Sequence, residues 1–210
     1  CSVVTSLDYK TFALDTLKSS INITSDCILY SQIVVTGSLN VTGVPDANGV
    51  LPKIIGGGSN RLFKVESGGE LVVKYLNLTG AFSAYAGGAI CCYQCDGNIT
   101  IIGSILSSNT AAYGSGVYFY NCNKLEIIRS QITKNNASHG TYGGGGVSIW
   151  GSGTSYIKET VIKANTAQIG GKNLHLSSWN GKSPISYFIN TKFGDTLDVG
   201  IDVNPEPYNC

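Results

Sequence analysis

The chain has 210 residues, a formal net charge of +1 and only 13% charged residues. That length is sufficient for one well-buried domain. The near-neutral charge excludes the basic surface that nucleic-acid-binding proteins need, so we expect no nucleic-acid partner. No apolar run approaches the length of a membrane span, so we expect no membrane-spanning segment.

Residues 1–27 are predicted to form an N-terminal cap. Thr5 and Asp8 have the spacing of a helix capping box, and apolar residues from Leu7 to Leu17 recur at roughly helical spacing. A short helix here would cover the open end of the following segment. The chain begins at Cys1 and contains no Met, which favours removal of a secretory signal and a secreted or cell-surface protein.

Residues 28–194 are expected to form the main body, because segments within it are copies of one another. Each copy opens with a glycine-rich tetrapeptide and ends with an apolar-x-x-Asn step. The openings are Gly87-Gly88-Ala89-Ile90, Gly114-Ser115-Gly116-Val117 and Gly144-Gly145-Gly146-Val147, with a weaker fourth at Gly170-Gly171. Repeats of this length indicate one unit stacked many times.

The apolar residues determine the register of these copies. Ile90, Val117, Val147 and Leu174 follow at steps of 27, 30 and 27 residues, and a second inward series lies two residues later: Cys92, Phe119, Ile149 and Leu176. A period of two indicates a strand with one inward face, and equal steps indicate parallel strands lying over one another. The sequence predicts an all-β parallel β-helix with glycine corners, an Asn corner, and hydrogen bonds between stacked Asn109, Asn135 and Asn165.

These motifs resemble the Gly-Gly-Ala-Ile and apolar-x-x-Asn repeats of the polymorphic outer-membrane adhesins, within the pectin-lyase-like superfamily. Gly87-Gly88-Ala89-Ile90 matches the first motif literally, and Leu106-Ser107-Ser108-Asn109 is a typical second motif. The resemblance covers about residues 28–176 and implies a right-handed β-helix. The family's C-terminal membrane barrel has no counterpart in this chain, so its membrane role is not inferred. Residues 195–210, with Pro205 and Pro207, are predicted to form a C-terminal tail that folds over the last coil or reaches a neighbour.

Seven cysteines indicate an oxidising compartment. Cys95 and Cys122 share the 27-residue step and are predicted to form a disulfide across adjacent coils, and Cys1 and Cys27 are a second candidate pair. Cys91, Cys92 and Cys210 remain without an assigned partner. A zinc site on Cys91, Cys92 and Cys95 lacks a second Cys/His pair at ligand spacing, so no metal or cofactor is expected.

Five Asn-x-Ser/Thr sequons predict N-glycosylation, at Asn22, Asn40, Asn77, Asn98 and Asn136. The alternative is that Asn and Thr are simply common at the corners of a β-helix. Real glycosylation would imply a eukaryotic source.

The resembled superfamily contains polysaccharide lyases and hydrolases, so the resemblance implies that the chain could be an enzyme of this kind. Glycoside hydrolysis needs two carboxylates facing one groove. From Gly87 to Leu176 the only acids are Asp96, Glu126 and Glu159, and none stacks on another. His139 is interpreted as a loop residue and His175 as a solvated outward residue, so no catalytic residue is predicted.

Tyr93, Tyr120 and Trp150 occupy one register, one residue after the inward series. They are expected to form an exposed aromatic strip that binds a sugar or a protein partner, or that only stabilises the sheet. The expected function is a non-enzymatic extracellular structural or adhesive glycoprotein that self-associates through its terminal segments into a filament or surface layer. The alternatives are a carbohydrate-binding module and a polysaccharide lyase or hydrolase.

Overall fold

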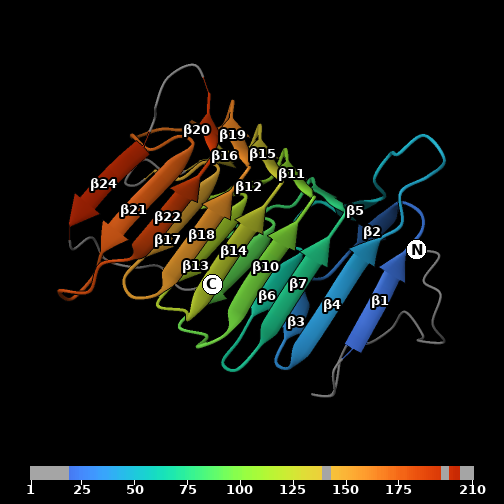
Figure 1. The fold of residues 1–210 in the computed structure, drawn as a ribbon, viewed down its shortest axis with the longest axis horizontal. Coiled ribbons are helices and arrows are strands. Elements are labelled where there is room, and N and C mark those ends of the chain that lie inside the picture. Colours follow the sequence, from blue (N-terminus) through green and yellow to red (C-terminus); the bar gives the residue numbers. More distant parts are fainter. Residues whose placement is uncertain (1–18, 139–142, 195–198, 204–210) are drawn as a thin grey trace.

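The computed structural model describes residues 19–138, 143–194 and 199–203, and there the chain winds into a parallel β-solenoid (Figure 1). Its strands build three seven-stranded sheets and one three-stranded sheet, all with parallel pairing. The repeat architecture predicted from the sequence is therefore confirmed. The predicted helical cap falls largely on residues 1–18, which lie outside the described residues.

Sheet A runs along one side of the coil. Its strands, in spatial order, are β1 (Ser19–Ile23), β4 (Ser38–Gly43), β7 (Glu70–Lys74), β10 (Asn98–Ile102), β14 (Lys124–Ile128), β18 (Thr154–Lys158) and β22 (Ile185–Ile189). Sheet B follows it in each coil with β2 (Cys27–Leu29), β5 (Lys53–Gly56), β8 (Asn77–Thr79), β11 (Ile105–Ser107), β15 (Gln131–Thr133), β19 (Val161–Lys163) and β23 (Lys192–Phe193).

Sheet C completes each coil and holds the copies recognised in the sequence. Its strands are β3 (Ile33–Val35), β6 (Phe63–Val65), β9 (Ile90–Tyr93), β13 (Val117–Tyr120), β17 (Val147–Trp150), β21 (Leu174–Ser178) and β24 (Val199–Val203). The short sheet D lies between sheets B and C and contains β12 (Thr110–Ala111), β16 (Asn136–Ala137) and β20 (Thr166–Ala167). Strands β1 and β24 extend the solenoid beyond the predicted limits of 28 and 194 on both sides.

The register of sheet C is the one predicted from the apolar steps. Val117 pairs with Ile90 and with Val147, and Val147 pairs with Leu174. The inward residues of the three large sheets form one continuous apolar core along the coil axis. Each inward column is a stack of like side chains, so every internal coil buries its apolar face against the coils on both sides.

The predicted asparagine ladder is present and buried. Asn109 Nδ2 donates to Asn135 Oδ1 at 2.9 Å, and Asn135 Nδ2 donates to Asn165 Oδ1 at 3.0 Å. Asn173 ends the ladder by accepting from Asn165 Nδ2 at 3.0 Å. These side chains satisfy backbone groups that the corner between sheets B and D would otherwise leave unpaired.

The left-handed residue at this corner is not the asparagine. Positive φ angles fall one residue earlier, at Ser108 (56°), Lys134 (57°) and Ala164 (53°). The predicted reason for the Asn corner is therefore wrong, because these asparagines are selected for their buried amides and not for their backbone conformation.

Glycines are required where adjacent coils approach closely. A Cβ at Gly97 would collide with the backbone carbonyl of Gly69 on the neighbouring coil. In contrast, a Cβ at Gly170 would meet open space, and its φ is not in the left-handed region. Among the described residues, no helix has the length and apolar character needed to cross a membrane.

Candidate functional site

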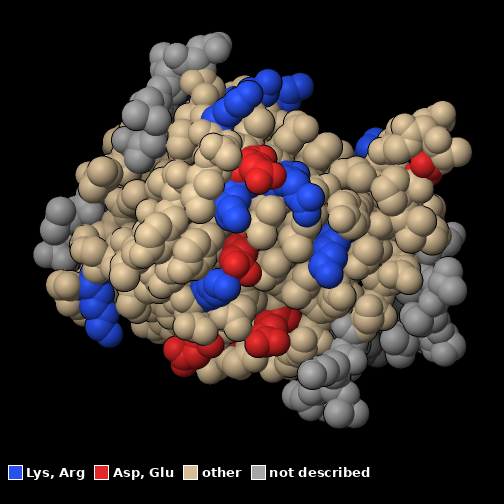
Figure 2. Space-filling model, viewed as in Figure 1, with Lys and Arg blue, Asp and Glu red and all other residues tan. Residues whose placement is uncertain are grey.

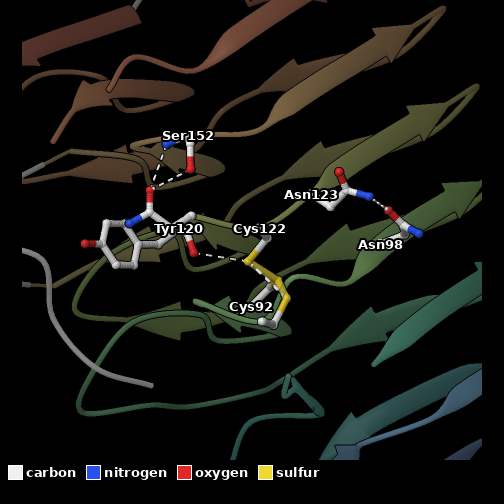
Figure 3. The surroundings of a disulfide bond; sticks show 8 residues. Cys92, Asn98, Tyr120, Cys122, Asn123 and Ser152 are labelled. Carbon is white, nitrogen blue, oxygen red and sulfur yellow. Dashed lines mark hydrogen bonds between the residues drawn. A yellow bond between two sulfur atoms is a disulfide. The ribbon is translucent and has the colours of Figure 1, made fainter. Parts of the chain in front are cut away.

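Three cysteine side chains converge at the corner where sheet C turns into sheet A (Figure 3). Cys92 points inward from β9, Cys95 lies in the turn after β9, and Cys122 lies one coil further along, after β13. All three are buried, with Cys122 retaining 3% of its surface. The 27-residue step stacks Cys95 on Cys122, and the inward register of β9 brings Cys92 to the same corner.

The structure places Cys92 close enough to form a disulfide with either Cys95 or Cys122, across Cα–Cα distances of 5.8 and 6.7 Å, and its sulfur can bond only one of them. The Sγ atoms of Cys95 and Cys122 lie 3.0 Å apart. The prediction that Cys95 and Cys122 lie together is confirmed, but the sequence-based pairing leaves out Cys92, whose sulfur lies at the same corner. Cys27 and Cys91 are also disulfide-bonded. Cys1 and Cys210 lie outside the described residues.

A surface groove of about 610 Å³ opens beside this cluster, and Cys122 forms part of its wall. Residues of four successive turns line it besides Cys122: Asp96, Asn121, Asn123, Ser152, Gly153, Thr154, Lys182, Ser183 and the apolar Ile185. Asn121 Oδ1 accepts hydrogen bonds from the Ser152 backbone N–H at 2.8 Å and from its hydroxyl at 3.1 Å. The groove therefore has one carboxylate, Asp96, and one ammonium, Lys182, among its lining side chains.

The three acids considered for catalysis lie in different environments. Asp96 is exposed in the groove beside the cysteine cluster, whereas Glu126 is on the outer face of β14, where Lys124 Nζ lies 3.0 Å from its Oε1. Glu126 pairs with Tyr156 on the next coil, as the spacing predicted. Glu159 occupies the turn after β18 with φ of 50°. Among the described residues, Asp96 is the one of these three acids that lines the groove, and Glu126 lines a smaller pocket together with Glu70.

The aromatic strip has the predicted register but not the predicted exposure. Tyr120 pairs with Tyr93 and with Trp150, yet Tyr120 is 1% exposed and Trp150 is fully buried, while Tyr93 is half-buried. The prediction of an exposed ligand or partner strip is wrong. The reason is a second apolar cluster on the outer face of sheet C, formed by Ala86, Cys91, Ala112, Tyr113, Tyr118, Tyr120 and Trp150.

The covering residues come partly from the connections that precede the strands of sheet C. Ala86 lies between β8 and β9, and Tyr113 lies between β12 and β13. Within the cluster, Trp150 Nε1 donates to Ser148 Oγ at 2.6 Å, which satisfies the indole N–H away from water. Burial, followed by the neighbouring phenol of Tyr93, raises the pKa of Tyr120 above its ordinary value. The strip is part of the packed interior.

His175 is also buried, which corrects the prediction that it is solvated. It points outward from β21 as predicted, pairing with Ser148, but it is only 1% exposed. Its ring stacks on Trp150 with 5.7 Å between centroids, and its Nδ1 accepts a hydrogen bond from the Gly143 N–H at 3.1 Å. The same second layer explains the burial. His139 lies outside the described residues.

All five sequon asparagines lie on strands at outward positions, and none is buried. Asn22 and Asn136 are exposed, and the other three are half-buried on β4, β8 and β10. Attachment of a glycan at these positions would not disturb the core. Glycosylation itself stays a prediction.

A second aromatic pair was missed from the sequence. Tyr156 on β18 and Tyr187 on β22 stack with 5.0 Å between centroids and 8° between planes, on the outer face of sheet A. Lys124 Nζ lies 5.5 Å from the centre of the Tyr156 ring. The sequence signal for this pair is that Tyr156 and Tyr187 occupy the same position in successive strands of sheet A.

Comparison with known proteins finds no matching family model, no similar curated protein and no similar solved structure.

Proposed function

We propose that this protein is a non-enzymatic extracellular structural or adhesive subunit that self-associates through the ends of its solenoid. One observation carries the proposal: the C-terminal coil exposes apolar side chains that would be core residues in any internal coil. The finer features predicted from the sequence, a right-handed adhesin-like β-helix, secretion and glycosylation, belong to the same proposal.

Two inward columns end in exposed residues at this coil. Phe188 continues the column of Ile127 and Ile157, which are buried, but is itself 38% exposed. Ile201 continues the column of Ile149 and Leu176 and is 73% exposed. At the opposite end, the inward residues Ile21 and Ile23 of β1 are buried. The apolar end surface of the described chain is thus at the C-terminal coil.

Further apolar residues enlarge this end surface. Ile185, Tyr187 and Ile189 lie at outward positions of β22, at the rim of this end, and are 56%, 47% and 42% exposed; β22, β23 and β24 are the terminal strands of their sheets. On the face drawn in Figure 2, charged side chains gather around the middle, and the surface toward the C-terminal coils is mainly uncharged. Such an unpaired edge with apolar side chains is a template for another strand.

A second copy of this chain is the occupant that fits. Every internal coil interface joins parallel strands over one cross-section, and a solenoid end presents that same cross-section. A contact between unlike ends leads to a filament, whereas a contact between two C-terminal ends gives a closed dimer. Electron microscopy of the native protein distinguishes the two assemblies.

Sedimentation velocity over a wide concentration range tests the proposal. We expect the native protein to form oligomers and Ile201→Lys to raise the dissociation constant by at least about tenfold, because a charge would be desolvated in the contact. Val50→Lys is the matched control, since Val50 is 57% exposed in a connection away from that end. A native protein that stays monomeric at high concentration, or equal effects of both substitutions, would contradict the proposal.

Carbohydrate binding remains a second candidate because of the Tyr156–Tyr187 stack. One face of the Tyr156 ring is covered by Tyr187, so a sugar ring would stack on the exposed Tyr187. Binding of a polysaccharide that is lost in Tyr187→Ala, without any change in oligomeric state, would support this function over self-association.

A further inference from the structure

We propose that the outer face of sheet B, over its last three strands, is a docking surface for a sulfated polysaccharide. This surface, the basic ledge, consists of the outward residues of β15, β19 and β23 and the turns that flank these strands. It lies on a different sheet from the Tyr156–Tyr187 stack, which belongs to sheet A. The inference is also independent of the proposed self-association, which uses the end of the solenoid.

Cations gather on this ledge from three successive coils. Two flank β15, two belong to the coil of β19, and one lies on β23. They are Arg129, Lys134, Lys158, Lys163 and Lys192. Within residues 129–134, 158–163 and 190–194, the one acid is Glu159. The ledge therefore carries a marked positive charge, although the net charge of the whole chain is only +1.

The strand register brings these cations together. Lys134 directly follows Thr133, which pairs with Lys163 on the next strand, and Lys192 pairs with Val161. At the other side of the ledge, the Arg129 backbone N–H donates to the Lys158 carbonyl oxygen at 2.9 Å. Strands of up to three residues, spaced about 4.8 Å apart, give a surface roughly 10 Å wide and roughly 10 Å long. All five charges therefore lie on or beside a small area.

These cations are not neutralised within the described part of the chain. The three ion pairs found there involve lysines of β5, β6 and β14, and none includes a cation of the ledge. Lys134, Lys163 and Lys192 are exposed. Figure 2 shows Lys and Arg side chains along the upper edge of the molecule, where Figure 1 places β15 and β19. Because like charges at this spacing repel one another, an anionic partner that neutralises them is favoured.

The charge density of the ledge selects the class of partner. Several cations within about 10 Å require a chain with anionic groups close together along its length. A heavily sulfated polysaccharide carries more than one anionic group per sugar, whereas a polyuronate carries one. Between the cations, Gln131 and Thr133 occupy outward positions of β15, where an amide and a hydroxyl can bond sugar hydroxyls and sulfate oxygens.

A nucleic acid fits this surface less well. Proteins that bind single strands provide aromatic side chains on which the bases stack. The outward residues of the three ledge strands include no aromatic side chain: they are Gln131, Thr133, Val161, Lys163 and Lys192. The ledge therefore offers charge and hydrogen-bonding groups, which suit a sulfated sugar chain.

Isothermal titration calorimetry with a size-defined heparin oligosaccharide tests the proposal. We expect the native protein to bind it at low ionic strength, and the affinity to fall steeply as salt is added because counterions are released. Lys163→Gln should weaken binding at least about threefold and reduce the slope of log K against log salt by about one. The double variant Lys134→Gln/Lys163→Gln should weaken binding at least about tenfold and reduce that slope by about two.

Lys53→Gln is the matched control, with circular dichroism used to verify the folding of each variant. It removes the same charge from the same sheet, but Lys53 lies on β5 and is already paired with Asp26 at 3.9 Å. Binding by Lys53→Gln should be within about twofold of that by the native protein. Ile201→Lys, which alters the end of the solenoid, should still bind heparin, and this result separates the ledge from the self-association contact.

Four results would overturn the proposal. The first is no binding of heparin at low salt, and the second is an equal loss in Lys163→Gln and Lys53→Gln. The third is equally tight binding of polygalacturonate, which would show that sulfate is not selected. The fourth is equally tight binding of a single-stranded DNA oligonucleotide, which would make the ledge a nucleic-acid surface.

Discussion

Replacing Asn135 by alanine tests whether the buried asparagine ladder stabilises this solenoid. The Asn135 side chain makes four hydrogen bonds within the core. Its Oδ1 accepts from the backbone N–H and the side-chain amide of Asn109, at 3.0 and 2.9 Å. Its Nδ2 donates to the Leu106 carbonyl at 3.0 Å and to Asn165 Oδ1 at 3.0 Å.

The expected cost follows from the groups that the substitution leaves without these partners. The Asn109 backbone N–H and one hydrogen of its amide lose their acceptor, and the Leu106 carbonyl loses a donor. Each buried polar group left unpaired costs about 1–3 kcal/mol, and a water entering the space of the amide would recover part of that. We expect Asn135→Ala to lower the free energy of unfolding by about 3–5 kcal/mol, a large fraction of the roughly 5–15 kcal/mol typical of a domain.

Urea unfolding of both proteins, followed by circular dichroism, measures this difference. Asn123→Ala is the matched control. Asn123 is exposed, and its side-chain amide donates one hydrogen bond, to Asn98 Oδ1 at 3.0 Å. That variant should lose less than about 1 kcal/mol. If Asn135→Ala costs no more than Asn123→Ala, with the same denaturant dependence in both, then the ladder is not a stabilising element and the reasoning is wrong.

Three further predictions concern the second layer and the coil contacts. Trp150→Ala should cost about 3–5 kcal/mol in chemical unfolding, whereas Tyr187→Ala should cost less than about 1 kcal/mol, and equal losses would contradict the burial of the strip. Gly97→Ala should lower the free energy of unfolding by about 1–3 kcal/mol, and with it the melting temperature, because the new Cβ collides with the Gly69 carbonyl. Gly170→Ala should leave both nearly unchanged. Because the pKa of Tyr120 is raised in the folded state, its contribution to stability is complete below pH about 10 and is lost as pH rises through the folded pKa. Tyr120→Phe should therefore show a smaller loss of stability between neutral and strongly alkaline pH than the native chain does, and identical pH profiles would refute this assignment.

The sequence by itself determined the solenoid, its parallel strands and the register of sheet C. Repetition explains why: a side chain that faces inward in one coil faces inward in all, so the steps of 27, 30 and 27 residues fix which residues stack. Column relations of this kind predicted the pairing of Tyr120 with Trp150, the proximity of Cys95 to Cys122 and the bonds between Asn109, Asn135 and Asn165.

Only the tertiary structure decided which residues pack against the outer face of sheet C. Trp150 and His175 point outward by their register, and register alone does not reveal that a second apolar layer covers them. Cys92 joins the cluster because two columns meet at one corner, a relation between different sheets that no single repeat step encodes. Burial and bonding depend on contacts among segments whose spacing is irregular, and for those the tertiary arrangement is the only source.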